Sequence, residues 1–582
     1  MRYSPTKLLH GLLYMTPVAL LALAACGGGG GSTSSAPLAG AYTLSVNVTG
    51  VSGVGVVLRN NGGDDLAVTT PGTYDFATQV LSATGYNVTV LSHPSAPVQL
   101  CTVGTVAIPS TGTMPAYNLT VNVDCVNAYT IGGNISGDAS LGAGIGPILR
   151  NNGGDDLFIA TLPAAGSSVP FTFTTPVASG STYTVTQLSK ARSPGQDCSN
   201  ITPVSGVVST ANIIDVTIIC VSQPIVPHFA YVANSTANTV SAYAIDSVTG
   251  ALSPVNSPST GTEPLSVTVD PSGRFAYVAN SKSNTISAYS INIPSGALTE
   301  IDQNGALAGT TVATGAGPAF ITIHPLGKFA YVVNLVGDTI SAYSINTTSG
   351  ALSAIDANGA LAGTTIATGM QPSEVIVDPT GQFAYVANYG DNINPGSVSV
   401  YSINQTSGAL TAGTEVQAGL GASSIAIDPY GKFLLVANNT SNNVTFYTIS
   451  NGALTTKTTT SVAGSNPNPR SIAIDPKTGV YAYVANAGGG VSAYTINPTT
   501  GVLTEMASSP FAAGTLPFSV NVDPSGYFVY VANLGSNDVS VYSIDAGGAL
   551  TQVACGPAGP PCDAAGNNFL AGAGPFSVTT TQ

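Results

Sequence analysis

The stretch Tyr231-Val232-Ala233-Asn234 occurs seven times in this chain of 582 residues, twice with one substitution. Val333 replaces Ala in the third copy, and Leu435 replaces Tyr in the fifth. The copies span 231–234, 277–280, 331–334, 385–388, 435–438, 483–486 and 530–533. Their starts are separated by 46, 54, 54, 50, 48 and 47 residues, intervals that are typical of a repeated four-stranded β-sheet.

The residues around each copy repeat as well. A complete unit has a strand at 264–269, a turn at 270–273, strands at 275–279 and 285–291, and a short fourth strand from 296 to 299. The first copy has no strand before it, whereas residues 574–579 copy 514–520 and are followed by no turn. We therefore predict that the C-terminal strand completes the first unit. This pairing closes a seven-bladed β-propeller over 223–582 and leaves no open sheet edge.

The repeat resembles the YVTN-type, lactonase-like seven-bladed propellers, and the likeness covers about 227–582. That group includes a sugar-lactone hydrolase, a muconate cycloisomerase and many cell-surface proteins without an assigned reaction. The resemblance implies a fold. It implies no catalytic residue here, because the repeated residues are those that every blade needs.

The N-terminus predicts export. Arg2 and Lys7 precede an apolar run, and the signal peptide is expected to cover 1–25. Leu23-Ala24-Ala25-Cys26 resembles the lipobox of bacterial lipoproteins, which implies cleavage before Cys26 and acylation of that residue. Residues 26–40 form a Gly/Ser tether. We expect a lipid-anchored protein of the bacterial cell envelope, with the outer membrane favoured by Gly27. The alternative is an ordinary signal with an incidental cysteine.

A second kind of repeat occurs twice, at 41–126 and at 127–222. Both contain Leu-Arg-Asn-Asn-Gly-Gly-Asp-Asp-Leu, at 58–66 and 149–157, and both end in a strand that closes on a cysteine. Their short alternating segments predict tandem β-sandwiches of antiparallel strands, so the whole fold is expected to be all-β. The copies resemble immunoglobulin-like modules of bacterial surface lipoproteins, although the chain contains no Trp.

The repeated segments at 58–66 and 149–157 are predicted to be hairpins, and they contain residues that could bind a metal ion. Carboxylates beside Asn carbonyls suit calcium, which would involve Asp64, Asp65, Asp155 and Asp156. The favoured interpretation is a tight turn, because Asn-Gly tolerates positive φ and no spaced calcium loop is present. No cofactor is expected.

Six cysteines besides Cys26 fall into three local pairs. An oxidising compartment allows disulfides within each pair, and the spacings do not fit a zinc site. The pairs are Cys101 with Cys125, Cys198 with Cys220, and Cys555 with Cys562.

Charge excludes one class of partner. Lys and Arg total 13 against 27 Asp and Glu, a net charge of −14, and only 7% of residues are charged. A nucleic-acid binder needs a basic surface, so nucleic acid is not expected as a partner.

A few ionisable residues could serve a site at the propeller mouth. Glu263, Glu374 and Arg470 lie just before or within inner strands and could orient a ligand, although the favoured interpretation is ordinary surface charge. His324 is a weak candidate for a general base. It takes the place of an aspartate that opens a Pro-containing turn in five blades, and we interpret these aspartates as structural: Asp270, Asp378, Asp428, Asp475 and Asp523.

These observations leave three functional hypotheses open. The favoured one is a lipid-anchored, non-enzymatic protein whose propeller binds a protein or glycan partner. The alternative is a lactonase-like hydrolase or isomerase acting on sugar lactones or sugar acids at the propeller mouth. The third is a purely structural envelope component.

Overall fold

The computed structural model describes most of the chain from residue 40 onward. The described residues are 40–105, 108–137, 146–152, 155–159, 162, 167–189, 196–222, 228–302, 311–357, 365–391, 393–464, 467–497, 500–555 and 562–581. The predicted signal peptide, Cys26 and the tether up to residue 39 lie outside them. Within these residues all regular secondary structure is β-strand, and no helix is long and apolar enough to cross a membrane.

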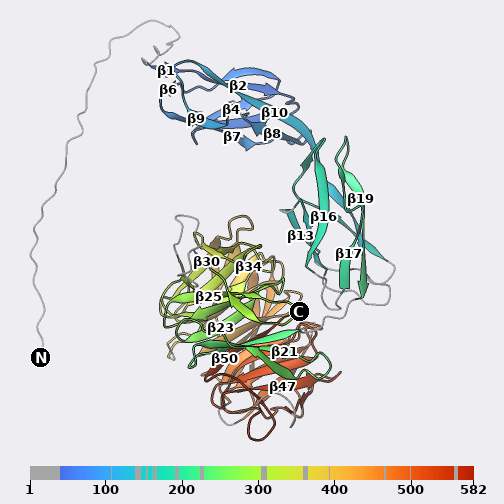
Figure 1. Cartoon of the computed structure of the whole chain (residues 1–582), viewed down its shortest axis with the longest axis vertical. Helices are drawn as coiled ribbons and strands as arrows, with labels where there is room; N and C mark the ends of the chain where they lie inside the picture. The colour runs from blue at the N-terminus through green and yellow to red at the C-terminus, as the bar shows by residue number, and fades with distance from the viewer. Residues whose placement is uncertain are drawn as a thin grey trace, which may run out of the picture. The chain divides into compact units, whose positions relative to one another are not determined.

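The chain divides into two compact units, residues 1–125 and 126–582. Figure 1 colours the strands of both by residue number. The strands that precede the propeller have the following bounds: Ala41–Tyr42 (β1), Leu44–Thr49 (β2), Val56–Asn60 (β3), Asp64–Val68 (β4), Gly72–Asp75 (β5), Val80–Leu81 (β6), Gly85–Ser92 (β7), Gln99–Val103 (β8), Thr111–Thr113 (β9), Leu119–Tyr129 (β10), Ile131–Ser136 (β11), Ile148–Asn151 (β12), Asp155–Phe158 (β13), Ser168–Thr172 (β14), Val177–Ala178 (β15), Thr182–Ser189 (β16), Gln196–Thr202 (β17), Ser205–Val207 (β18) and Ile213–Ser222 (β19).

Each of the two N-terminal repeats, 41–126 and 127–222, forms two main sheets around its own apolar core. In the first copy the sheets are β4-β3-β7-β9 and β10-β2-β5, with β8 beside β10. In the second they are β13-β12-β16-β18 and β14-β11-β19-β17. Alternate apolar residues of both sheets, such as Val46 and Leu58, are fully buried in the first core. In strands such as β2 and β3, the alternation of the sequence therefore places one face inside.

The expectation of antiparallel strands throughout is wrong for one pair in each copy. β2 pairs with β10, and β11 with β19, in parallel. These strands lie near the start and at the end of their copies, so a long connection separates them and no hairpin forces them to run in opposite directions. Disulfides join Cys101 to Cys125, Cys198 to Cys220 and Cys555 to Cys562, the same local pairs into which the sequence groups them.

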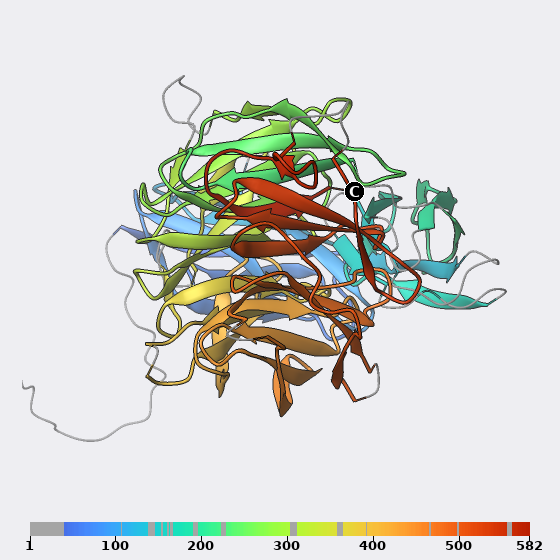
Figure 2. The same ribbon diagram turned by 90° about the horizontal axis from the view of Figure 1, so that it is seen from below.

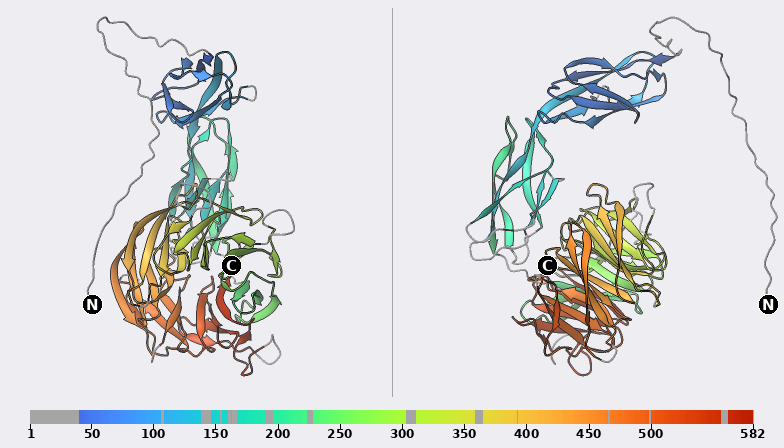
Figure 3. Two further views of the ribbon diagram at one scale, coloured as in Figure 1. Left: turned by 90° about the vertical axis from the view of Figure 1, so that its left-hand side faces the viewer. Right: turned by 180° about the vertical axis from the view of Figure 1, so that it is seen from behind.

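Seven sheets follow, each with its strands in the order inner, second, third and fourth. Figure 3 shows them arranged round a ring. Blade by blade, their bounds are: one, Pro575–Thr580 (β50), Phe229–Asn234 (β20), Thr239–Ile245 (β21), Leu252–Asn256 (β22); two, Pro264–Val269 (β23), Phe275–Asn280 (β24), Thr285–Ile291 (β25), Leu298–Glu300 (β26), with Thr311–Ala313 (β27); three, Pro318–Ile323 (β28), Phe329–Asn334 (β29), Thr339–Ile345 (β30), Leu352–Ala354 (β31), with Ile366–Ala367 (β32); four, Pro372–Val377 (β33), Phe383–Asn388 (β34), Ser397–Ile403 (β35), Leu410–Gln417 (β36); five, Ala422–Ile427 (β37), Phe433–Asn438 (β38), Asn443–Ser450 (β39), Ala453–Ser461 (β40); six, Pro469–Ile474 (β41), Tyr481–Asn486 (β42), Val491–Ile496 (β43), Leu503–Glu505 (β44); seven, Pro517–Val522 (β45), Phe528–Asn533 (β46), Asp538–Ile544 (β47), Leu550–Gln552 (β48), with Phe569–Leu570 (β49).

The C-terminal strand closes the ring, as predicted. β50 pairs antiparallel with β20 from Ala230 opposite Thr580 to Asn234 opposite Pro575. It also lies beside β45 and β23, the inner strands of the last and second blades. Figure 2 marks the C-terminus next to the red C-terminal strands. The two ends of the propeller are thus held in one sheet.

The repeated tyrosine has a structural reason. In six blades its hydroxyl is buried and donates a hydrogen bond to a glycine carbonyl of the next blade, as Tyr277 does to Gly350 (2.9 Å). Tyr530 closes the cycle by donating to Gly250 of blade one (3.1 Å). Where Leu435 replaces Tyr this hydroxyl is absent, and Leu435 lies in one buried apolar cluster with Phe446, its partner on β39 of the same blade.

The aspartates that open the turns after the inner strands are structural, as interpreted. Asp428 accepts the backbone N–H groups of Tyr430 (3.1 Å), Lys432 (2.5 Å) and Phe433 (2.7 Å). Burial raises the pKa of Asp378, Asp428 and Asp523, while these hydrogen bonds oppose the rise. These carboxylates accept the backbone N–H groups of the turns and therefore have a structural role.

Candidate functional site

The inner strands of all seven blades line a central cavity of about 510 Å³. In most blades the second or third residue of the inner strand, or both, line the cavity. The second residues include Arg470, Phe518 and Phe576, and the third include Glu374. Glu374 and Arg470 are the only charged side chains among the described residues that line it.

The third residue of the inner strand is serine in five blades, and its hydroxyl links neighbouring blades. Ser424 accepts the N–H of Ile472 (3.1 Å), and Ser471 accepts the N–H of Val520 (3.2 Å). Ser519, Ser577 and Ser266 accept the N–H of the fourth inner-strand residue of the next blade in the same way. We call these five residues the serine belt.

Glu374 occupies the belt position in blade four. Its Oε2 accepts the N–H of Ile425 at 3.1 Å, the contact that serine makes elsewhere, and Ser424 also donates a hydrogen bond to the carboxylate. Burial raises the pKa of Glu374 to about 7, although both hydrogen bonds oppose the rise. Near neutral pH the group therefore exists in both protonation states, as a general acid or base requires.

Arg470 faces the same cavity without a counter-ion. The one ion pair among the described residues is Arg59 with Asp65, so Arg470 and Glu374 do not neutralise each other by direct contact. The buried Nε of Arg470 has no hydrogen-bond partner in the described part of the chain. Its guanidinium lies over the ring of Phe518, 5.2 Å from the centroid. It therefore has donors available for an oxygen of a ligand.

The ring of Phe518 packs against a second aromatic ring, that of Phe576. Its centroid is 4.1 Å from that of Phe576, with a 44° angle between the planes. We call Phe518 and Phe576 the aromatic platform. The platform lies on one side of the cavity, and Glu374 and the serines of blades four and five lie on another, so a bound ligand would meet an apolar and a polar surface.

A hydrogen-bond network holds the residues that immediately precede β41, the strand that carries Arg470. The Tyr389 hydroxyl, which also lines the cavity, donates to Asn439 Oδ1 (3.0 Å). The Asn439 amide contacts Asn468, and the N–H of Asn468 donates to Asn442 Oδ1 (2.9 Å). These side chains fix the backbone immediately before β41.

The sequence did not single out Ser424, Phe518 or Phe576. The signal that could have found them is their register: each is the second or third residue of an inner strand. Tyr389 follows the repeated asparagine of blade four, in the loop 388–394 that the propeller pattern places at the mouth.

Glu263 does not line the cavity. It precedes β23 and has a left-handed backbone conformation (φ 58°). Its N–H donates a hydrogen bond to Asn238 Oδ1 (2.8 Å), and its carbonyl accepts one from the N–H of Ser281 (2.8 Å). Gly317, Gly421 and Gly574 hold the equivalent place in other blades, also with positive φ. The position is therefore set by backbone geometry, and the structure does not bring Glu263 to the candidate site.

We predict that Glu263→Gly stabilises the propeller by about 0.5–1 kcal/mol, because the cost of a left-handed non-glycine residue exceeds the extra chain entropy of glycine. Thermal denaturation at neutral pH measures this. The neighbouring variant Thr262→Gly, at a residue without positive φ, should lose stability. Equal loss in both variants would contradict the strain argument.

His324 is also absent from the cavity. It is fully buried at the far end of β28, in the turn position that aspartate holds elsewhere. Its Nδ1 accepts the N–H of Leu326 (3.1 Å), so the proton on Nε2 donates to the carbonyl of Gly381 (3.0 Å). Nδ1 is thus bonded within its own turn and Nε2 to the turn of blade four, so His324 offers no free base to a ligand.

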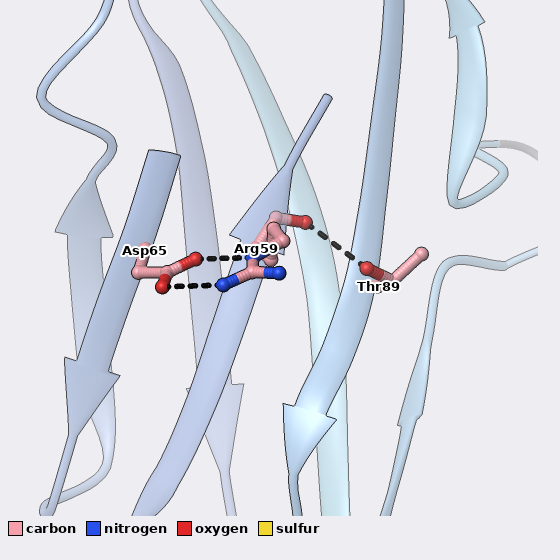
Figure 4. A network of polar contacts seen from close by, with 3 residues as sticks. All are labelled: Arg59, Asp65 and Thr89. Atoms are coloured by element: carbon pink, nitrogen blue, oxygen red, sulfur yellow. Dashed lines mark hydrogen bonds and ion pairs between the residues drawn. The ribbon is translucent and has the colours of Figure 1, made fainter. Parts of the chain in front are cut away.

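The proposed calcium hairpins use their carboxylates for protein contacts. Asp65 binds Arg59 through both oxygens, with Nε–Oδ1 at 2.5 Å and a second contact at 2.8 Å; Figure 4 also shows Thr89 donating to the Arg59 carbonyl. Asp64 accepts the N–H of Thr78, and Asp155 that of Thr175, each at 2.8 Å. The Asp156 side chain lies outside the described part of the structure.

Asn61 (φ 49°) lies in the tight turn that the sequence predicts, in which the Gly63 N–H donates to the Asn60 carbonyl (3.2 Å). Asn152 also has a positive φ (50°), and residues 153–154 of the second turn lie outside the described residues. In the described part of the chain, no three His, Cys, Asp or Glu side chains are grouped to hold a metal ion.

Comparisons with known proteins agree with this architecture. A family model described as lactonase, 7-bladed beta-propeller, matches residues 226–312, 305–467 and 450–557. A 98-residue stretch, 17% of this chain, is 36% identical to 6-phosphogluconolactonase of Bacillus subtilis (strain 168), and it spans 27% of that protein's length.

Two solved structures share the propeller fold. They are candidate 6-phosphogluconolactonases from Bacteroides fragilis NCTC 9343 and Bacteroides uniformis ATCC 8492. Both have a TM-score of 0.51, at 20% and 19% identity, over 61% of this chain and 98% and 100% of theirs. The matched family model spans more than half of the residues, and the chain belongs to the lactonase family of seven-bladed β-propellers.

Proposed function

We propose that this protein hydrolyses a sugar lactone in the central cavity of the propeller. The observation that carries the proposal is Glu374: a carboxylate replaces a belt serine, its pKa is raised to about 7, and it shares the cavity with an unpaired arginine. The relatives named as 6-phosphogluconolactonases support a lactone as the substrate class. They favour this function over binding of a protein or glycan without a reaction.

The chemistry follows from the two charged groups. Glu374 as carboxylate takes a proton from water, and the resulting hydroxide attacks the lactone carbonyl carbon. Arg470 stabilises the negative charge that develops on the carbonyl oxygen. When the ring C–O bond breaks, the leaving oxygen takes the proton from Glu374, which returns to the carboxylate. The product is the open-chain hydroxy acid, and water is the only co-reactant.

Arg470→Met should lower kcat/KM for glucono-δ-lactone by about 10²-fold, because the variant loses one charged donor to the developing oxyanion. Initial rates above spontaneous hydrolysis, measured on the purified chain, test this. Arg470→Lys keeps the charge without the planar fork and should fall between wild type and Arg470→Met. No hydrolysis above background by the wild-type chain would refute the proposed function.

We also propose that the chain is exported and anchored by lipid at Cys26, with the repeats at 41–126 and 127–222 acting as immunoglobulin-like spacers. The supporting observations are the lipobox-like sequence and the three disulfides, which fit an oxidising compartment. Fractionation of cells carrying Cys26→Ser tests the anchor. The variant should leave the membrane fraction, and retention there would contradict lipid attachment.

A further inference from the structure

We propose that the substrate is a sugar lactone without a phosphate group. This inference rests on the proposed function and narrows it. It concerns a difference from the relatives, whose name specifies a 6-phospho sugar.

The cavity lacks the charges that a phosphate needs. Its described lining holds one cation, Arg470, and one acid, Glu374, and the reaction requires Glu374 as an anion. A phosphate monoester carries nearly two negative charges near neutral pH and is normally held by several charged donors. If Arg470 stabilises the carbonyl oxygen, no described cationic lining residue remains for a phosphate.

Besides Arg470, five cations of the propeller have described side chains, and none of them lines the cavity: Arg274, Lys282, Lys328, Lys432 and Lys477. Arg274 donates to the carbonyl of Thr347 (2.5 Å), next to the turn that follows β23. Lys432 lies over the ring of Tyr430 (5.3 Å) and Lys477 over that of Tyr527 (3.8 Å), both in the equivalent turns of other blades. These turns follow the far ends of the inner strands, and none of the three residues lines the cavity.

What the cavity offers is suited to a neutral sugar. The hydroxyls of Ser471, Ser519 and Ser577 each accept a backbone N–H, and no acceptor for their own protons lies within hydrogen-bonding distance in the described structure. They can donate to ring or hydroxyl oxygens of a ligand. The aromatic platform can cover the C–H face of a sugar ring.

The test compares kcat/KM for glucono-δ-lactone and 6-phosphoglucono-δ-lactone on the full chain, with spontaneous hydrolysis subtracted. We expect the unphosphorylated lactone to be preferred at least tenfold. Equal or greater kcat/KM for the phosphorylated lactone would overturn this inference and leave lactone hydrolysis intact. Turnover of neither lactone would overturn the proposed function itself, and the inference with it.

A gain-of-charge variant tests the same reasoning in the opposite direction. Ala319 lines the cavity as the second residue of β28, so Ala319→Lys adds a cation without removing a polar contact. The ratio of kcat/KM values should move at least tenfold toward the phosphorylated lactone. Ala319→Met, of similar length and uncharged, should not move it. The same ratio in the lysine and methionine variants would contradict the proposal.

Discussion

Glu374→Gln should lower kcat for lactone hydrolysis by about 10²–10⁴-fold, the range that general-base catalysis usually contributes. The amide oxygen of glutamine can still accept the N–H of Ile425, so the belt contact between blades four and five is kept. What is lost is the group that accepts a proton from water. Initial-rate measurements with glucono-δ-lactone at pH 8 give the comparison with wild type.

Two further measurements separate catalysis from folding. Glu300→Gln, at an exposed residue of β26, is the matched control and should retain full activity. A Glu374→Gln variant that hydrolyses lactone at the wild-type rate would eliminate Glu374 as the base. The stability of Glu374→Gln is measured alongside the rate, and the variant is expected to remain folded while losing activity.

The same substitution should make the protein more stable at alkaline pH. The folded-state pKa of Glu374, about 7, is above the ordinary value of 4.5, so the folded state binds this proton more tightly than the unfolded state. Its contribution to stability is full below about pH 4.5 and is lost as pH rises through 7. The advantage of Glu374→Gln over wild type should therefore grow by about 2–3 kcal/mol between pH 4.5 and pH 8. Urea unfolding at both pH values measures it.

Ending the chain at residue 573, before β50, should abolish cooperative folding of the propeller. The truncation removes the strand that pairs with β20, the buried Val578 and the bonds between Phe229 and Thr581. About five ladder hydrogen bonds at ~1 kcal/mol each, with two buried apolar side chains at ~2 kcal/mol each, amount to on the order of 10 kcal/mol. A domain is typically stable by only about 5–15 kcal/mol.

Calorimetry of the truncated and complete chains tests ring closure. Val578→Ala is the graded variant, because it keeps the strand and removes only buried hydrocarbon; it should cost about 2 kcal/mol. A truncated chain whose propeller unfolds at the wild-type temperature would contradict the importance of the closing strand.

The sequence predicted the propeller because its repeated residues have repeated structural tasks. The repeated Tyr links neighbouring blades, and Asp428 and its equivalents accept the N–H groups of the turns. The C-terminal strand β50 pairs with β20, as the sequence predicts from the missing inner strand of the first unit. Each of these features recurs at a regular interval, so the pattern is visible in one chain. The favoured hypothesis of a binding protein without a reaction has no support from the comparisons, which favour the lactonase alternative.

The site was only partly predictable because its residues are exceptions within the repeat. Glu374 and Arg470 were identifiable as rare charges in inner strands, and both line the cavity. Glu263 looks similar in sequence, but it precedes the strand and occupies a strained turn, whereas Glu374 is the third residue of β33. Phe518 and Phe576 resemble ordinary core residues in sequence, and only the ring places one against the other.

The measurement that tests the central claim most directly is the pH dependence of kcat/KM for glucono-δ-lactone, corrected for spontaneous hydrolysis. Because the base form of Glu374 is the carboxylate, kcat/KM should rise with pH, show one inflection near 7 and then level. The inflection should be absent from the residual activity of Glu374→Gln. An unchanged inflection in that variant, or a wild-type rate that follows hydroxide concentration without levelling, would contradict catalysis by Glu374.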